Sequence, residues 1–135
     1  IMKVLDAIDK GQSPTIMGDG SEAFDFVAVE DCALANLAAM KANIADQYYN
    51  VGTGKRTSLK ELAELLIEIT GCQKPINYAP RSEATFVRNR IGCPQKAIKE
   101  IQFKATIDLL EGLKRLVDWR NSHQEEVITR RKAVG

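Results

Sequence analysis

Hydrophobic residues recur every three or four positions in several stretches of the chain, a pattern that predicts amphipathic helices. The first stripe spans residues 2–8, and Gly11 follows it at the place of a helix C-cap glycine. The strongest stripe spans residues 59–69. It opens with the capping-box pattern Ser-Leu-Lys-Glu at 58–61 and closes at Gly71. We therefore expect helices over both stretches.

Three further helices are expected on the same grounds. One begins at Glu30 or Asp31 and ends near Asn43. A short one spans residues 94–101, with a proline at its first position. The last begins near Asp108. The residues expected to face the core in the first of these helices are Leu34, Leu37 and Ala38, and in the last Leu109, Leu113, Leu116 and Val117.

Short β-prone runs between turn residues predict strands at 15–17, 24–29, 48–51 and 76–78. Strand and helix signals alternate along the chain, which favours an α/β domain with some parallel strands. We expect a small α/β lobe with a few short strands and about five helices. Because the strands are few and short, the chain has the character of one lobe of a larger protein.

Composition narrows the class of protein. The chain has 135 residues, enough for one domain. Its 19 Lys and Arg residues nearly balance its 18 Asp and Glu residues, which argues against nucleic acid as the main partner. No membrane partner and no signal peptide are expected, because no apolar run approaches roughly 18 residues. The three widely spaced cysteines favour free thiols and a cytoplasmic location.

Residues 48–58, YYNVGTGKRTS, raise the question of a phosphate-binding loop. The P-loop pattern is absent, because Arg56 and not Ser or Thr follows Gly54-Lys55. The dinucleotide pattern is also absent, because the sixth position from Gly52 is not glycine. Two interpretations stay open. The loop is either a tight turn that needs glycine, or a set of backbone N–H groups that meet an anion at a helix N-terminus.

The order of several motifs carries a family resemblance. PTIMGDGSEAFDFVAVEDCALANLAAM (14–40) is followed by YYNVGTGKRTSLKELAELL (48–66), then by a polar, arginine-bearing segment, and then by EGLKRLVDW (111–119). Together they resemble the C-terminal half of the extended short-chain dehydrogenases. These are the NAD-dependent nucleotide-sugar epimerases and dehydratases of the UDP-glucose 4-epimerase type. The resemblance covers roughly residues 1–121.

In that family the N-terminal half is a Rossmann domain, which binds NAD and carries a catalytic Tyr-x-x-x-Lys. This sequence contains neither the glycine-rich NAD loop nor a Tyr-x-x-x-Lys. The resemblance therefore implies a substrate-binding part that lacks the Rossmann domain. NAD is expected in the full-length protein, bound by its N-terminal domain, and no cofactor or catalytic residue is expected in this chain. Alone, the chain is expected to have no turnover.

The resemblance also points to residues that bind the nucleotide-sugar. Met17 and Gly18 match the strand and turn that meet the nucleotide base. Phe24 stands where relatives carry an arginine that contacts the diphosphate, two residues before the aromatic Phe26. Another arginine of the phosphate clamp should lie within 81–90, because a guanidinium donates paired hydrogen bonds to phosphate oxygens. The alternative is that these arginines are solvated loop charges. The expected substrate-binding residues are Met17, Gly18, Phe24, Phe26, Arg81, Arg88 and Arg90.

The expected substrate-binding domain spans residues 1–121 and is followed by a polar tail at 122–135. Its first helix has no N-cap signal before Ile1, so the domain is expected to be truncated at its N-terminus. The expected partner is a nucleotide-sugar, and a homodimer is left open. The second hypothesis is a stand-alone module that binds a nucleotide or a protein without chemistry. Phe24 in place of an arginine favours this module, whereas the uncapped first helix disfavours it.

Overall fold

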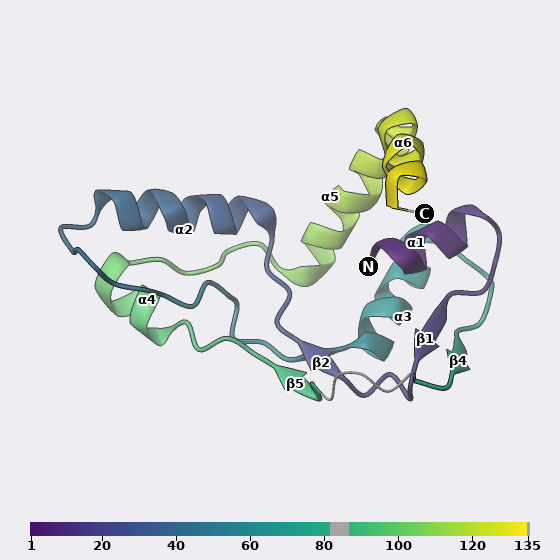
Figure 1. The fold of residues 1–135 in the computed structure, drawn as a ribbon, viewed down its shortest axis with the longest axis horizontal. Coiled ribbons are helices and arrows are strands. Elements are labelled where there is room, and N and C mark those ends of the chain that lie inside the picture. The colour runs from purple at the N-terminus through teal and green to yellow at the C-terminus, as the bar shows by residue number, and fades with distance from the viewer. Residues whose placement is uncertain (82–86, 135) are drawn as a thin grey trace.

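The computed structural model describes residues 1–81 and 87–134, which form six helices and five short strands. The molecule is elongated, with a body at one end and an arm at the other (Figure 1). The helices of the body are α1 (Met2–Asp9), α3 (Leu59–Thr70), α5 (Leu109–Ser122) and α6 (Gln124–Val134). The helices of the arm are α2 (Val29–Lys41) and α4 (Gln95–Ile101).

Two small sheets lie at the foot of the body. In the first, β1 (Thr15–Met17) pairs in parallel with β4 (Asn77–Ala79). In the second, β2 (Ala23–Phe24) lies between antiparallel β3 (Thr57–Ser58) and parallel β5 (Asn89–Arg90). The expectation of a small α/β lobe with some parallel strands is confirmed. The described residues contain six helices where about five were expected.

Each end of the molecule has its own hydrophobic core. The body core joins α1, α3 and α5 through Leu5, Leu62, Leu66 and Leu113. The arm core joins α2 to α4 and the segment after it through Ala35, Ala97, Ile101 and Phe103. Burying these apolar side chains supplies the main favourable free energy of folding at each end.

Helix α3 forms as its sequence predicts. The Ser58 hydroxyl accepts the Glu61 N–H at 3.1 Å, and the Glu61 carboxylate accepts the Ser58 N–H at 2.6 Å. This reciprocal capping satisfies two N–H groups that an isolated helix start would leave unpaired. The helix ends at Gly71, whose φ of +67° is in the left-handed region that favours glycine.

The arm departs from the sequence pattern. No strand forms at 48–51, and the run expected as a strand over 24–29 pairs only at its start, in β2. On α2 the buried apolar residue is Ala35, whereas Leu34 and Leu37 are 50% and 44% exposed. The physical reason is that strand pairing and helix orientation depend on partners distant in sequence, which local periodicity does not specify.

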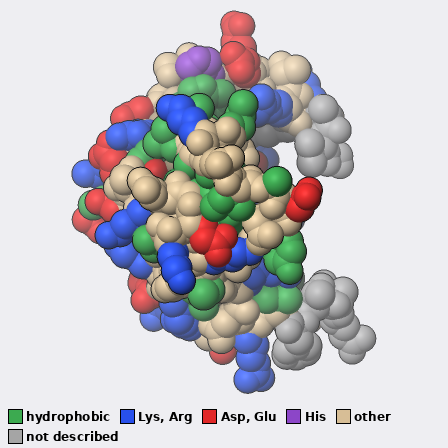
Figure 2. Space-filling model, turned by 90° about the vertical axis from the view of Figure 1, so that its left-hand side faces the viewer, with side chains coloured by type: hydrophobic (Ala, Val, Ile, Leu, Met, Phe, Trp, Pro, Cys, Tyr) green, Lys and Arg blue, Asp and Glu red, His purple; other side chains and the backbone are tan. Residues whose placement is uncertain are grey.

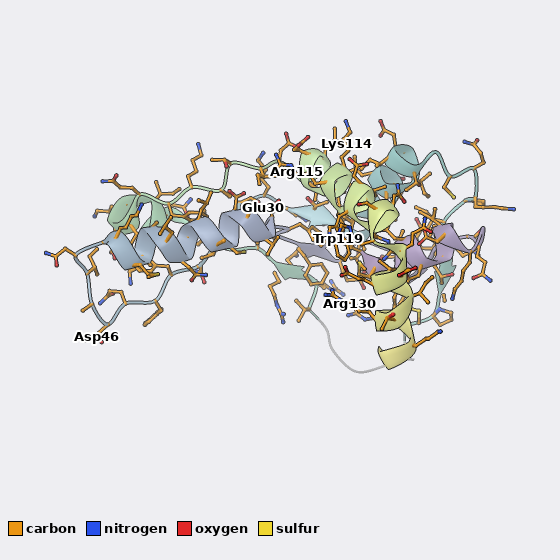
Figure 3. The ribbon with its side chains drawn as sticks, turned by 90° about the horizontal axis from the view of Figure 1, so that it is seen from above. Glu30, Asp46, Lys114, Arg115, Trp119 and Arg130 are labelled. Carbon is orange, nitrogen blue, oxygen red and sulfur yellow. The ribbon has the colours of Figure 1, made fainter. Side chains whose placement is uncertain are left out.

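The C-terminal segment is helical, where a polar tail was expected. Val127 of α6 is buried, and the His123 ring stacks on Trp119 with ring centroids 4.9 Å apart. The Arg130 guanidinium lies 5.9 Å from the Trp119 ring, and Figure 3 shows these two residues on neighbouring helices. Residues of α6 therefore pack back onto α5. The domain boundary near 121 stays a prediction.

Candidate functional site

The carboxyl ends of β1 and β4 meet at one edge of their sheet. Met17 is opposite Ala79 in the parallel register, and the Gly18 N–H donates to the Ala79 carbonyl at 2.9 Å. Gly18 has a φ of +84°, a conformation that suits glycine and turns the chain sharply after the strand. Arg81 follows β4 by two residues, so this edge brings three expected site residues together: Met17, Gly18 and Arg81. Open α/β sheets bind ligands at the carboxyl ends of their strands.

A buried carboxylate lies beneath this edge. Glu22 is only 7% exposed, and its Oε1 pairs with Nη1 of Arg81. A Cβ built on Gly18 would lie 3.0 Å from the same Oε1, so the carboxylate lies directly against the turn after β1. Sequence analysis did not single out Glu22, because nothing in its local pattern distinguishes it from a solvated loop residue.

Phe24 and Arg90 belong to strands of the second sheet, and Arg88 directly precedes β5. The Ala23 N–H donates to the Arg88 carbonyl at 2.8 Å, and Asp25 N–H to the Arg90 carbonyl at 3.0 Å. These bonds hold the backbones of the two arginines beside β2, while both residues are exposed. Phe24 lies edge-on to Phe26, with ring centroids 6.2 Å apart.

Phe26 packs at the edge of the body core. It is partly buried against the body core cluster, and it also lines a cavity of about 450 Å³ between the start of α2 and α5. The six other expected residues, Met17, Gly18, Phe24, Arg81, Arg88 and Arg90, lie in or next to strands β1, β2, β4 and β5.

One further arginine binds the loop between the two sheets. Arg56 donates from Nη2 to the Ser21 carbonyl at 3.1 Å and from Nε to Asn89 Oδ1 at 3.3 Å. Asp19 lies in the same loop, and hydrogen bonds from Ser21 lower its pKa, with a smaller contribution from the charge of Arg88. Two basic side chains, Arg56 and Arg88, therefore act on the loop after β1, which itself carries the acidic Asp19.

The glycine loop is held by one carboxylate. Asp25 Oδ1 accepts the Thr53 N–H at 2.9 Å, and Oδ2 accepts the N–H groups of Gly54 at 2.8 Å and Gly92 at 3.3 Å. Burial alone would raise the pKa of Asp25, but the hydrogen bonds from Thr53, Gly54 and Gly92 outweigh it and lower this pKa. A Cβ on Gly52 would lie 2.5 Å from Asp25 Oδ2, so only glycine fits there.

These contacts decide between the two interpretations of YYNVGTGKRTS. The N–H groups of Thr53 and Gly54 donate to Asp25. At the start of α3, the N–H groups of residues 59–61 also have hydrogen-bond partners within the chain. Neither set of N–H groups is presented to a phosphate. The tight structural turn is the interpretation that the geometry supports. The same contacts mean that this loop does not fit the phosphates of a dinucleotide cofactor.

Other kinds of site find little support in the described part of the chain. No group of His, Cys, Asp and Glu side chains there could hold a metal ion. None of the described helices combines the length and the apolar character that a membrane crossing requires. On the face toward the end of the arm, positive, negative and hydrophobic side chains are interspersed (Figure 2).

Comparison with known proteins identifies the architecture. A profile described as the NAD dependent epimerase/dehydratase family matches residues 1–52. A putative UDP-glucose 4-epimerase of Methanocaldococcus jannaschii is 38% identical over 120 residues, which cover 88% of this chain and 38% of that protein. The chain is therefore similar to members of the NAD-dependent epimerase/dehydratase family over most of its length. The resemblance inferred from the order of motifs is thereby confirmed.

Solved structures agree with this assignment. The UDP-glucose 4-epimerase of Thermotoga maritima, determined with UDP-glucose, superposes with a TM-score of 0.82 at 34% identity. The match covers 88% of this chain and 38% of that one. An epimerase of Methanothermobacter thermautotrophicus superposes with a TM-score of 0.88 over 93% of this chain, which at 24% identity shows the fold. The chain thus spans 38% of the length of each of these relatives.

Proposed function

We propose that this chain is the nucleotide-sugar-binding part of an NAD-dependent epimerase or dehydratase, which acts on a UDP-hexose in the full-length protein. The observation that carries the proposal is the meeting of Met17, Gly18 and Arg81 at the carboxyl edge of β1 and β4. This edge offers a nucleotide base a strand and turn, and it offers a diphosphate a guanidinium. Relatives named as UDP-glucose 4-epimerases support the choice of a UDP-sugar.

In this proposal the chain contributes binding energy and no catalytic group. The nucleoside diphosphate does not react in an epimerisation or a dehydration. Interactions with it can instead orient the sugar for reaction elsewhere. Arg88 and Arg90, exposed beside β5, are proposed to complete the phosphate contacts together with Arg81. NAD, which supplies hydride transfer chemistry when bound, is proposed to bind outside this chain.

Binding of UDP-glucose by isothermal titration calorimetry tests this proposal. We expect the chain to bind UDP-glucose but, supplied with NAD, to convert none of it to another hexose. Replacing Arg81 or Arg90 by Gln should weaken binding about tenfold for a contact that contributes directly, since a charge-assisted hydrogen bond is lost. Arg130→Gln, on α6 outside both sheets, is the matched control and should bind normally. Absence of UDP-glucose binding, or turnover by this chain alone, would contradict the proposal.

A stand-alone binding module is the second candidate, and Phe24 is the observation that favours it. Its half-buried ring stands where the family resemblance implies a phosphate-binding arginine, so the proposed site would have one positive charge fewer. The coding sequence upstream of Ile1 separates the two candidates. A glycine-rich loop and a Tyr-x-x-x-Lys in frame there would favour the enzyme, and a start codon just before Ile1 would favour the module.

Exposed apolar side chains on α2 support the enzyme. Val29 and Met40 are 78% and 83% exposed, and Leu34 and Leu37 are also exposed on this helix. Exposed apolar patches commonly mark interaction surfaces. We expect the remainder of the enzyme to cover α2, since the relatives extend far beyond the matched region. A second copy of the chain is the competing occupant, and homodimer formation stays a prediction.

A further inference from the structure

The Glu22 carboxylate is unusual because one of its oxygens is buried without a partner. Oε1 pairs with Arg81, whereas Oε2 has no hydrogen-bond partner among the described residues. The Glu22 side chain is 9% exposed, but the Arg81 side chain is 33% exposed. Burying a carboxylate oxygen without a hydrogen-bond partner lowers the stability of the fold. The buried Oε2 therefore suggests that Glu22 has a role other than stabilising the fold.

The backbone around Glu22 is firmly anchored. Its carbonyl accepts the Leu59 N–H at 2.8 Å, and the Gly20 carbonyl accepts the Lys60 N–H at 3.1 Å. Both donors belong to the first turn of α3, which packs on the body core. The carboxylate is therefore attached to a rigid element, and so is the guanidinium that it holds.

The Glu22–Arg81 ion pair lies at the carboxyl edge of β1 and β4, where the ligand is proposed to bind. Glu22 lies against Gly18 at the end of β1, and Arg81 follows the end of β4. Arg81 has a long, flexible side chain, and holding it in one orientation before a ligand arrives lowers the entropy lost on binding. A buried carboxylate under the strand edge can hold the Arg81 guanidinium in one orientation. An exposed carboxylate could rotate into solvent and would hold it less firmly.

We propose that Glu22 is a positioning residue, which holds the guanidinium of Arg81 at the carboxyl edge of β1 and β4 so that it meets the ligand's phosphate. This inference rests on the proposed function, because it takes Arg81 as a phosphate contact. Glu22 itself does not touch the ligand, since its Oε2 is inaccessible. Glu22 therefore affects ligand affinity only by orienting Arg81, and only the affinity that comes from the phosphate contact.

Glu22→Met tests the inference, because methionine fills a similar volume and has no acceptor for Arg81. Affinity is measured by calorimetry with UDP and with uridine, which has no phosphate. We expect Glu22→Met to lose about tenfold in UDP affinity, as for a charge-assisted hydrogen bond, and to bind uridine normally. Glu22→Gln keeps an oxygen that accepts from Arg81, and should retain more UDP affinity. The thermal unfolding midpoint should change little in either variant, because the desolvated charge of Glu22 is removed while the Arg81 side chain, 33% exposed, keeps its contact with solvent.

The double variant with Arg81→Gln completes the experiment. If Glu22 acts through Arg81, adding Glu22→Met to Arg81→Gln should cause no further loss of UDP affinity. Unchanged UDP binding in Glu22→Met, or an equal loss for UDP and uridine with a lowered midpoint, would overturn this inference and leave the proposed function standing. A further loss in the double variant would do the same. Failure of the unmodified chain to bind UDP would overturn both.

Discussion

At the residue scale, single carboxylates organise segments that are far apart in sequence. Asp25 receives N–H groups from positions 28, 29 and 67 residues further along the chain. Glycine is required beside it because the space that a side chain would need is occupied by the carboxylate. The sequence showed glycines at 52 and 54, but their reason became clear only with Asp25 in place.

Gly52→Ala should therefore destabilise the fold. Its Cβ would lie 2.5 Å from Asp25 Oδ2, and hydrogen bonds from the N–H groups of Gly54 and Gly92 hold that oxygen in place. We expect a loss of about 2 kcal/mol in the free energy of unfolding, the usual size of an overpacking effect. Urea denaturation measures it.

Gly112→Ala is the matched control for this substitution. A Cβ on Gly112 would meet Ile107 at an ordinary 3.7 Å, and Gly112 lies within helix α5. This variant should gain about 1 kcal/mol from helix propensity. Equal stability of the two alanine variants would show that Asp25 does not restrict position 52.

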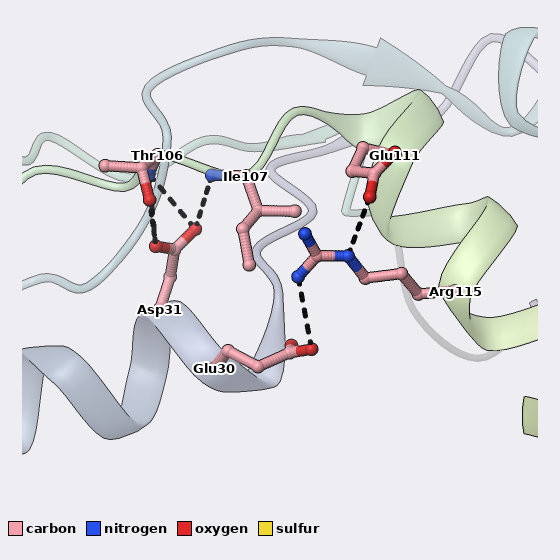
Figure 4. A network of polar contacts seen from close by, with 6 residues as sticks. All are labelled: Glu30, Asp31, Thr106, Ile107, Glu111 and Arg115. Carbon is pink, nitrogen blue, oxygen red and sulfur yellow. Dashed lines mark hydrogen bonds and ion pairs between the residues drawn. The ribbon is translucent and has the colours of Figure 1, made fainter.

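At the element scale, the arm is fastened to the body by the first turn of α2. Asp31 is fully buried and accepts the Thr106 N–H at 3.1 Å and the Ile107 N–H at 3.0 Å (Figure 4). Beside it, exposed Glu30 lies 3.6 Å from Arg115 of α5. The sequence suggested either acid as a helix cap, yet α2 has no side-chain cap, and Asp31 reaches the segment before α5 instead.

Asp31→Ala should loosen this junction. Two backbone N–H groups and the Thr106 hydroxyl would lose the acceptor that the fully buried Asp31 carboxylate provides. We expect a loss of about 3 kcal/mol in unfolding free energy, with faster amide exchange at Thr106 and Ile107. Glu30→Ala is the neighbouring control, and an exposed ion pair such as Glu30–Arg115 should cost only about 0.5 kcal/mol. Similar losses in both variants would contradict this account.

At the scale of the whole molecule, one arginine joins the first helix to the fifth. Arg120 of α5 is 4% exposed and donates from Nη2 to Asp6 at 2.9 Å and to Asp9 at 2.6 Å, both on α1. These contacts connect residues more than 100 positions apart. They close the body around the leucine core, and the periodicity of neither helix indicated them.

Arg120→Met should detach α1 more readily than it unfolds the core. We expect a loss of about 2 kcal/mol, below the range for fully buried pairs, because both carboxylates keep contact with solvent. Arg115→Met on the same helix is the control, since its ion pairs are about half exposed and should cost about 0.5 kcal/mol. Thermal unfolding compares the two variants. An equal loss from both would show that burial of Arg120 is unimportant.

The sequence by itself determined the features whose causes are local. The capping box and Gly71 bound α3, the Asp108 side chain caps α5 as its position suggests, and residues 15–17 form β1. Each depends on hydrogen bonds or apolar spacing within a few residues, which can be read along the chain. The family resemblance was likewise accessible, because the order of motifs is a property of the sequence.

The tertiary structure alone decided the features that need partners distant in sequence. Residues 48–51 form no strand, and Ala35 is the buried apolar residue of α2. The Glu22 carboxylate pairs with Arg81, which is 59 residues away in the sequence. The physical reason is that strand pairing, helix orientation and buried ion pairs are fixed by packing and by the cost of unpaired polar groups. Local sequence specifies which groups are present, and the fold specifies which of them meet.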